Sequence, residues 1–77
     1  MPITMRVLSA GTIEFKPYNS TAYPADEAIF IPLLNGVNIG DSVVNNVNVW
    51  HFEPSVSTSP KVVNVQEGDV FKIYRMP

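Results

Sequence analysis

The sequence predicts an all-β fold, either a small antiparallel β-barrel or a β-sandwich of six to seven short strands. Apolar and polar residues alternate in short runs, as they do in half-buried strands. Turn residues separate these runs at regular spacing, and no repeat or low-complexity tract is present. The 77 residues predict a single domain over 1–77, because a chain of this length supports only one core.

The first sixteen residues predict a hairpin. Residues 3–9 alternate in polarity, and residues 12–16 alternate again with Ile13 and Phe15 pointing inward. An alanine and a glycine between the two runs turn the chain. The next segment, 17–26, has no strand or helix period, so we expect a surface loop.

Residues 28–39 predict a second hairpin. The apolar run 28–34 is followed by Asn35-Gly36, which favours a type I′ turn. Pro32 has no N–H for a ladder, so the first strand is expected at a sheet edge or at a bulge. An exposed apolar edge needs cover from a partner. The expected cross-strand pairs are Leu34 with Val37 and Pro32 with Ile39.

Residues 42–52 are expected to form the longest single strand, and residues 53–60 a loop rich in serine and proline. Asparagine alternates with valine in this strand, although asparagine is depleted in strands. We therefore expect the face that carries Trp50 and Phe52 to be half-exposed or paired with another chain.

Residues 61–75 predict a third hairpin. A three-residue turn over 66–68, with Gly68 in the left-handed region closing a G1 bulge, sorts the apolar residues onto one face. The expected pairs are Val65 with Asp69 and Val63 with Phe71. The expected core comprises Ile13, Phe15, Val47, Val49, Val63, Val65, Phe71 and Ile73.

The composition favours a protein that needs a partner. Hydrophobic residues make up 45% of the chain and charged residues only 16%, which is more apolar side chain than so small a core can hide. The chain has no cysteine and one histidine, so a disulfide is excluded and a His/Cys metal site is not expected. We expect no cofactor, and a homo-oligomer or docking on a larger protein assembly such as a capsid.

The charge pattern argues against nucleic-acid binding. The net charge is −2, and the five basic residues are scattered along the chain. The sequence also shows neither a signal peptide nor a membrane-spanning apolar stretch. We therefore expect no membrane partner, and a location in a virion if the gene comes from a phage, or otherwise in the cytoplasm.

Only Asp41, Ser42 and His51 suggest nucleophilic catalysis. A catalytic triad requires geometry that spacing cannot supply, and esterases with a Gly-Asp-Ser opening need a longer chain. We therefore expect a protein that is not an enzyme. His51 also has the pKa range of a pH switch, although a lone histidine at a strand end is more often structural.

Aromatic and apolar side chains are the best candidates for a binding surface. Tyrosine and tryptophan dominate protein interfaces and also stack on sugars. For Trp50, a place in the core is the main alternative. The candidate partner-binding residues are Tyr18, Tyr23, Phe30, Ile31, Leu33, Trp50, His51 and Tyr74.

The cysteine-free chain, its valine and asparagine run over 43–49, and its Pro/Ser/Thr loops resemble small all-β accessory proteins of tailed-phage virions. That group includes capsid decoration or cement proteins and head-fibre modules. The resemblance implies a non-catalytic subunit that self-associates and docks on a capsid. A carbohydrate-binding β-module that uses the exposed aromatics is the alternative, and an inhibitor of a host enzyme is a third interpretation.

Overall fold

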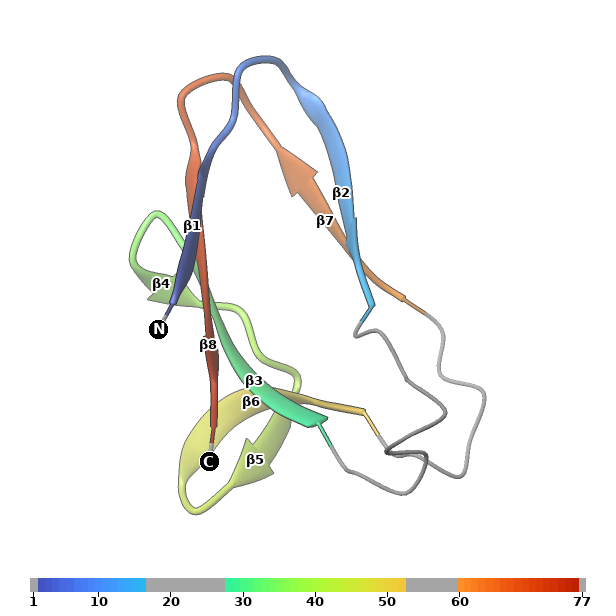
Figure 1. Ribbon diagram of the computed structural model, residues 1–77, viewed down its shortest axis with the longest axis vertical. Coiled ribbons are helices and arrows are strands. Elements are labelled where there is room, and N and C mark those ends of the chain that lie inside the picture. Colours follow the sequence, from blue (N-terminus) through green and yellow to red (C-terminus); the bar gives the residue numbers. More distant parts are fainter. Residues whose placement is uncertain (1, 17–27, 53–59, 77) are drawn as a thin grey trace.

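The computed structural model describes residues 2–16, 28–52 and 60–76, which form eight strands and no helix (Figure 1). Six strands form the main sheet, in the order β1-β8-β3-β6-β5 with β4 beside β3, while β2 and β7 form a second sheet. All strand pairs are antiparallel, and the main sheet does not close into a barrel. The strands are β1 (Ile3–Arg6), β2 (Gly11–Phe15), β3 (Ala28–Leu34), β4 (Val37–Asn38), β5 (Ser42–Val44), β6 (Val47–Phe52), β7 (Lys61–Val65) and β8 (Val70–Arg75).

The two ends of the chain pair with each other in one long two-stranded ribbon. Its first half, β1 with β8, belongs to the main sheet, and its second half, β2 with β7, forms the second sheet in the same register. The hairpins expected over 3–16 and 61–75 are therefore wrong. Alternation identifies a strand and its faces, but it does not choose the strand's partner. Val65 pairs with Gly11 and Phe71 with Met5, in place of the expected pairs.

The ribbon bends between its halves at a bulge. Val7 donates its N–H to the Asp69 carbonyl at 2.9 Å, and Gly68 donates its N–H to the Val7 carbonyl, also at 2.9 Å. Two residues thus oppose one, and Gly68 has a φ of 88°, as a G1 bulge requires. Asp69 also donates to the Gln66 carbonyl at 3.1 Å, which closes a β-turn. The predicted left-handed Gly68 is confirmed.

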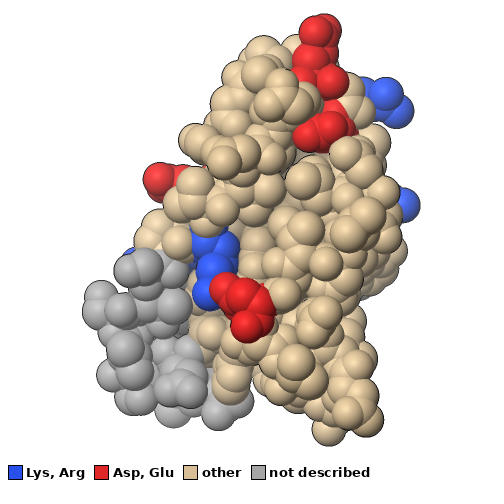
Figure 2. All heavy atoms as spheres, turned by 180° about the vertical axis from the view of Figure 1, so that it is seen from behind, with Lys and Arg blue, Asp and Glu red and all other residues tan. Residues whose placement is uncertain are grey.

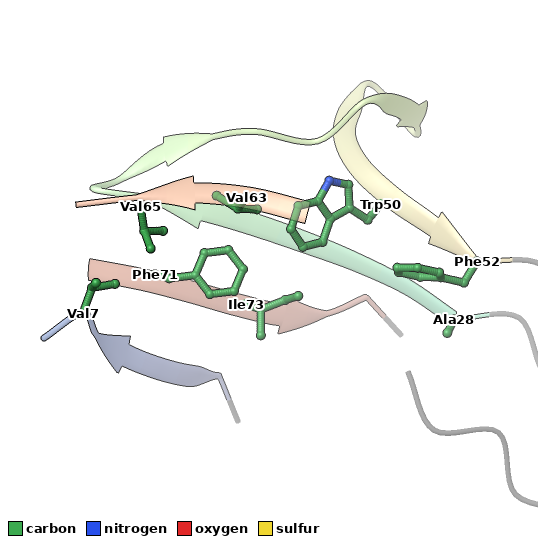
Figure 3. Close-up of a cluster of buried hydrophobic side chains, with 8 residues drawn as sticks. All are labelled: Val7, Ala28, Trp50, Phe52, Val63, Val65, Phe71 and Ile73. Carbon is green, nitrogen blue, oxygen red and sulfur yellow. The ribbon is translucent and has the colours of Figure 1, made fainter. Parts of the chain in front are cut away.

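The core lies between the two sheets (Figure 3). β7 supplies Val63 and Val65 from the second sheet, while β8 supplies Phe71 and Ile73 from the main sheet, so the predicted face sorting is confirmed. Aromatic rings also contribute to the packing between the two sheets. Phe15 of β2 contacts three rings of the main sheet. Its ring centroid is 5.0 Å from that of Phe30, 5.8 Å from that of Trp50 and 6.0 Å from that of Phe52.

The predicted core is correct in part. Five of its residues are buried, namely Val49, Val63, Val65, Phe71 and Ile73. Ile13 and Phe15 are half-buried and pack against the core. Val47 is half-buried, and both it and the buried Val49 lie outside the main cluster. Val7, Ala28 and Phe52 are core residues that the sequence pattern did not identify, and Trp50 is a core residue that it left as an alternative.

β3 lies in the middle of the main sheet, between β8 and β6, so the prediction of an edge strand is wrong. The predicted type I′ turn is confirmed, with φ of 52° at Asn35 and 79° at Gly36. Pro32 accepts the Ile39 N–H at 3.1 Å but has no N–H to return, so the β3–β4 ladder ends there. β6 pairs with the same side of β3 before the proline, at Ala28, Ile29 and Phe30.

The expected single strand over 42–52 is also wrong, because it contains a second tight hairpin, β5–β6. Asn45 and Asn46 have φ of 50° and 64°, and both lie between paired strands. Asparagine tolerates the left-handed region better than most residues, and a two-residue type I′ turn needs two such positions. The asparagines that looked unfavourable in a strand therefore make the turn.

Asn35 ties the β3–β4 turn to the bend of the ribbon. Its N–H donates to the Val70 carbonyl at 2.8 Å, and its side-chain Oδ1 accepts the Val70 N–H at 2.9 Å. Its Nδ2 donates to Asp69 Oδ1 at 3.0 Å, while Asp69 Oδ2 accepts the Gln66 N–H at 2.8 Å. The Asn35 hydrogen bond and then the Gln66 hydrogen bond lower the pKa of the Asp69 carboxyl.

The connection from β4 to β5 crosses tightly against β6. A Cβ built on Gly40 would lie 2.5 Å from the Asn48 carbonyl carbon and closer still to the Val49 nitrogen. Asn38 holds this crossing, because its Nδ2 donates to the Asn48 carbonyl at 2.9 Å and its Oδ1 accepts the Gly40 N–H at 2.8 Å. Only a residue without a side chain fits here.

Gly40→Ala should therefore destabilise the protein by about 1–3 kcal/mol or more, because the backbone of β6 has to move. Gly11→Ala is the matched control, since nothing lies within 4 Å of a Cβ at that position. Urea unfolding of both variants measures the difference. Equal midpoints for the two variants would show that the crossing is looser than described.

Asp69 should make stability depend on pH in the acid range. Its pKa is lower in the folded protein than in the unfolded chain, so the stabilisation is complete above its ordinary pKa, near pH 4. It is lost as the pH falls through the lowered folded value. Thermal midpoints of wild type and Asp69→Asn should therefore converge with acidification. Asn35→Gly keeps the backbone turn and should weaken this pH dependence; an unchanged dependence in both variants would assign it to other carboxyls.

Candidate interaction surface

The outer face of the main sheet, which points away from the core, is apolar along β3. Ala28 and Pro32 are buried on the core side. Because successive side chains of a strand point to opposite faces, Ile29, Ile31 and Leu33 point outward. All three are half-buried.

The neighbouring strands add an aromatic ring and a histidine to this face. In the strand register Ile31 lies opposite Tyr74 of β8, and Ile29 lies opposite His51 of β6. Directly opposed side chains on one face of a sheet are in contact range. Both Tyr74 and His51 are half-buried. We call this set of five residues the outer strip: Ile29, Ile31, Leu33, His51 and Tyr74.

Four of the eight sequence-predicted binding residues lie together in the outer strip, namely Ile31, Leu33, His51 and Tyr74. Phe30 points to the core side, where it packs against Phe15. Trp50 is only 3% exposed, so the core alternative holds for it. Tyr18 and Tyr23 lie outside the described residues. Ile29 is not among the eight, although it belongs to the apolar run 28–34 that was expected to need cover from a partner.

The charged strand residues on the outer face of the main sheet are basic. Lys72 lies opposite Leu33, and Arg6 lies opposite Val70 on the same face. The eight strands contain a single acidic residue, Glu14, which belongs to the second sheet. Figure 2 shows acidic and basic side chains only in scattered groups on the side that it presents. The outer face is therefore apolar with a basic margin.

Exposed apolar side chains also line the edges of the fold. Ile3 and Met5 of β1 stand on the core side of the main sheet, opposite Ile73 and Phe71, yet they are 61% and 42% exposed. They extend beyond the area that the second sheet covers. Among the described residues, Leu8, Val37, Val43 and Val62 are also large, hydrophobic and exposed.

Asp41 and Ser42, two of the three residues that could suggest catalysis, have structural contacts. Asp41 forms an ion pair with Lys61 at 2.8 Å, and Ser42 lies opposite Val49 in the β5–β6 register. Within ranges 2–16, 28–52 and 60–76, no three acidic, histidine or cysteine residues gather as metal ligands would. These same ranges contain no helix of the length and hydropathy that crossing a membrane requires.

No protein-family model matches the chain, and no curated protein and no solved structure matches it either.

The burial of Trp50 predicts a specific fluorescence behaviour. Trp50 is the only tryptophan and packs 5.9 Å from the Phe71 ring, centroid to centroid, so its emission should be blue-shifted and poorly quenched by acrylamide. The urea-unfolded chain is the control for full exposure. Added polysaccharide should leave the emission unchanged. Quenching as strong as in urea would contradict the described core.

Proposed function

We propose that this protein is a non-catalytic structural subunit that docks on a larger protein assembly through its outer strip. The observation that carries the proposal is the alignment of Ile29, Ile31 and Leu33 with Tyr74 and His51 on one sheet face. A contiguous apolar patch of this kind usually marks an interaction surface. Aromatic residues within it supply binding energy at a low entropy cost.

The margin of the outer strip indicates the chemistry of the partner. Arg6 and Lys72 flank the apolar residues, and no acidic residue lies in the described main-sheet strands. A partner surface with an apolar centre and carboxylates around it is complementary to this arrangement. Such charges raise the rate of association and select the partner more than they raise affinity.

The narrower form of the proposal is a virion accessory subunit of the capsid decoration or cement type. It rests on the resemblance in composition to small all-β phage proteins, together with the outer strip as a docking face. A subunit of this kind gains stability from its neighbours. This suits a chain with 45% hydrophobic residues and no cysteine for a disulfide.

The test is binding to particles from the phage or cell that encodes the chain. Ile31→Lys places a charge in the middle of the outer strip, and we expect it to reduce co-sedimentation with particles by about tenfold or more. Thr12→Lys is the matched control, because Thr12 is exposed on β2 of the second sheet. Thermal midpoints check that both variants stay folded.

Lys72→Glu examines the basic margin in the same assay. Reversing this charge should weaken binding and reverse its dependence on salt, since the favourable pair with a carboxylate becomes a repulsive one. Equal co-sedimentation of wild type, Ile31→Lys and Lys72→Glu would exclude the outer strip as the docking face. If the protein does not co-sediment with particles but is retained on a polysaccharide matrix, sugar binding would replace the proposed function.

A further inference from the structure

Strand β1 ends the main sheet with an unpaired edge. It pairs with β8 on one side, and within the described part of the chain no strand pairs with its other side. All four of its residues are exposed. Unpaired N–H and C=O groups of an edge strand are a template for pairing with another strand.

The hydrogen bonds at the bend show which peptide groups of β1 are free. Val7 donates toward the β8 side, to the Asp69 carbonyl. Backbone groups alternate in direction along a strand. The N–H and C=O groups of Ile3 and Met5 therefore point toward β8, while those of Thr4 and Arg6 point toward the open edge. The edge therefore offers two peptide units at the two-residue spacing of an antiparallel ladder.

The side chains of β1 make this edge apolar on one face. Ile3 and Met5 are 61% and 42% exposed although they stand beside the buried Ile73 and Phe71. A strand added at the edge would extend the core-side face of the sheet and cover them.

We infer that the strand added at this edge is β1 of a second copy, in antiparallel orientation, so that two main sheets join into one. A twofold axis perpendicular to the sheet keeps the core-side faces of both copies together, which requires core-side residues to oppose core-side residues. In the register proposed, Met5 lies opposite its counterpart, and Thr4 pairs with Arg6 of the other copy.

This register satisfies three constraints of the strand at once. It uses the free peptide groups of both Thr4 and Arg6. It keeps the two Arg6 side chains apart, whereas a shift by two residues in one direction would oppose them. A shift in the other direction would pair Arg6 with Pro2, which has no N–H to donate.

Pairing of β1 with β1 of a second copy is more favourable than pairing of β1 with β5, the strand at the opposite edge of the main sheet. The other end of the main sheet is β5, which has three residues and a single strongly exposed apolar side chain, Val43. Pairing of β1 with β5 would be head-to-tail and would build an open chain, whereas pairing of β1 with β1 closes as a dimer. Because β1 has only four residues, the interface is small, and we expect a weak, reversible dimer.

This inference gives a surface to the self-association expected of the subunit proposed above, and it uses a different surface from the outer strip. The two can therefore fail separately. Ile31→Lys, which disables the outer strip, should leave the β1 dimer unchanged.

Sedimentation of the full chain from low concentration up to about 1 mM tests the dimer. Wild type should shift from monomer to dimer across this range. Met5→Lys and Met5→Glu should each stay monomeric, because like charges would oppose each other at the axis. An equimolar mixture of these two variants should recover the dimer, since Lys and Glu would then be opposed. This recovery depends on the register and would not follow from a general loss of hydrophobicity.

A pair of proline variants tests the backbone contact. Thr4→Pro removes an outward N–H and leaves the β1–β8 ladder intact, so it should abolish the dimer and preserve the fold. Val43→Pro is the matched control on β5. Val44 and Val47 flank the two-residue turn and exchange hydrogen bonds, so the Val43 N–H points outward and the dimer should persist.

Four results would overturn the inference. These are a wild type that stays monomeric to the highest concentration, a dimer that survives Thr4→Pro, a mixture of the Met5 variants that stays monomeric, and a dimer lost in Val43→Pro. The last result would indicate head-to-tail pairing of β1 with β5.

Discussion

The pairing of the two chain ends is the constraint on which the rest of this structure depends. Residues near the N-terminus and near the C-terminus form one ribbon, which bends at the bulge at Gly68. The two halves keep the same register because residues 7–10 and 66–69, four on each strand, separate them. One half supplies strands to the main sheet, and the other half covers that sheet. Without the bend, Val63 and Val65 would not face Phe71 and Ile73 across a core.

A second device holds the bent ribbon against the central strand. The backbone N–H and the side chain of Asn35 bond both backbone groups of Val70 and the carboxylate of Asp69, so one residue joins the β3–β4 turn to the bulge. Because hydrogen bonds to a charged group are stronger than neutral ones, this contact is well suited to a small domain. The polar turn residues thus have a structural role, whereas the outer strip takes no part in these turn contacts.

The different widths of the two sheets explain where apolar residues remain exposed. The main sheet is five strands wide, and the second sheet, with two strands, is too narrow to cover it. Ile3, Met5 and Val37 therefore stay exposed on the core side of the main sheet. On the opposite face Ile29, Ile31 and Leu33 of β3 are half-buried. The two apolar areas differ in chemistry, because the β1 edge adds free peptide groups whereas the outer strip adds Tyr74 and a basic margin.

Local sequence pattern was enough to predict the all-β class, the type I′ turn at Asn35-Gly36 and the left-handed Gly68. It also predicted the face sorting of Val63, Val65, Phe71 and Ile73. These features follow from periodicity and from backbone sterics, which act within a few residues. The same periodicity places Ile31 and Leu33, two of the candidate binding residues, on one sheet face.

Which strands pair depends on contacts between distant segments, so the local sequence pattern does not predict it. Tertiary structure placed β3 at the centre of the sheet although Pro32 suggested an edge, because the proline stands where the partner changes from β4 to β6. It turned Asn45-Asn46 into a hairpin and buried Trp50, since the register of β6 on β3 sets which face meets the core. Pairing between residues that are distant in the chain depends on the burial of the whole, and no single segment contains that information.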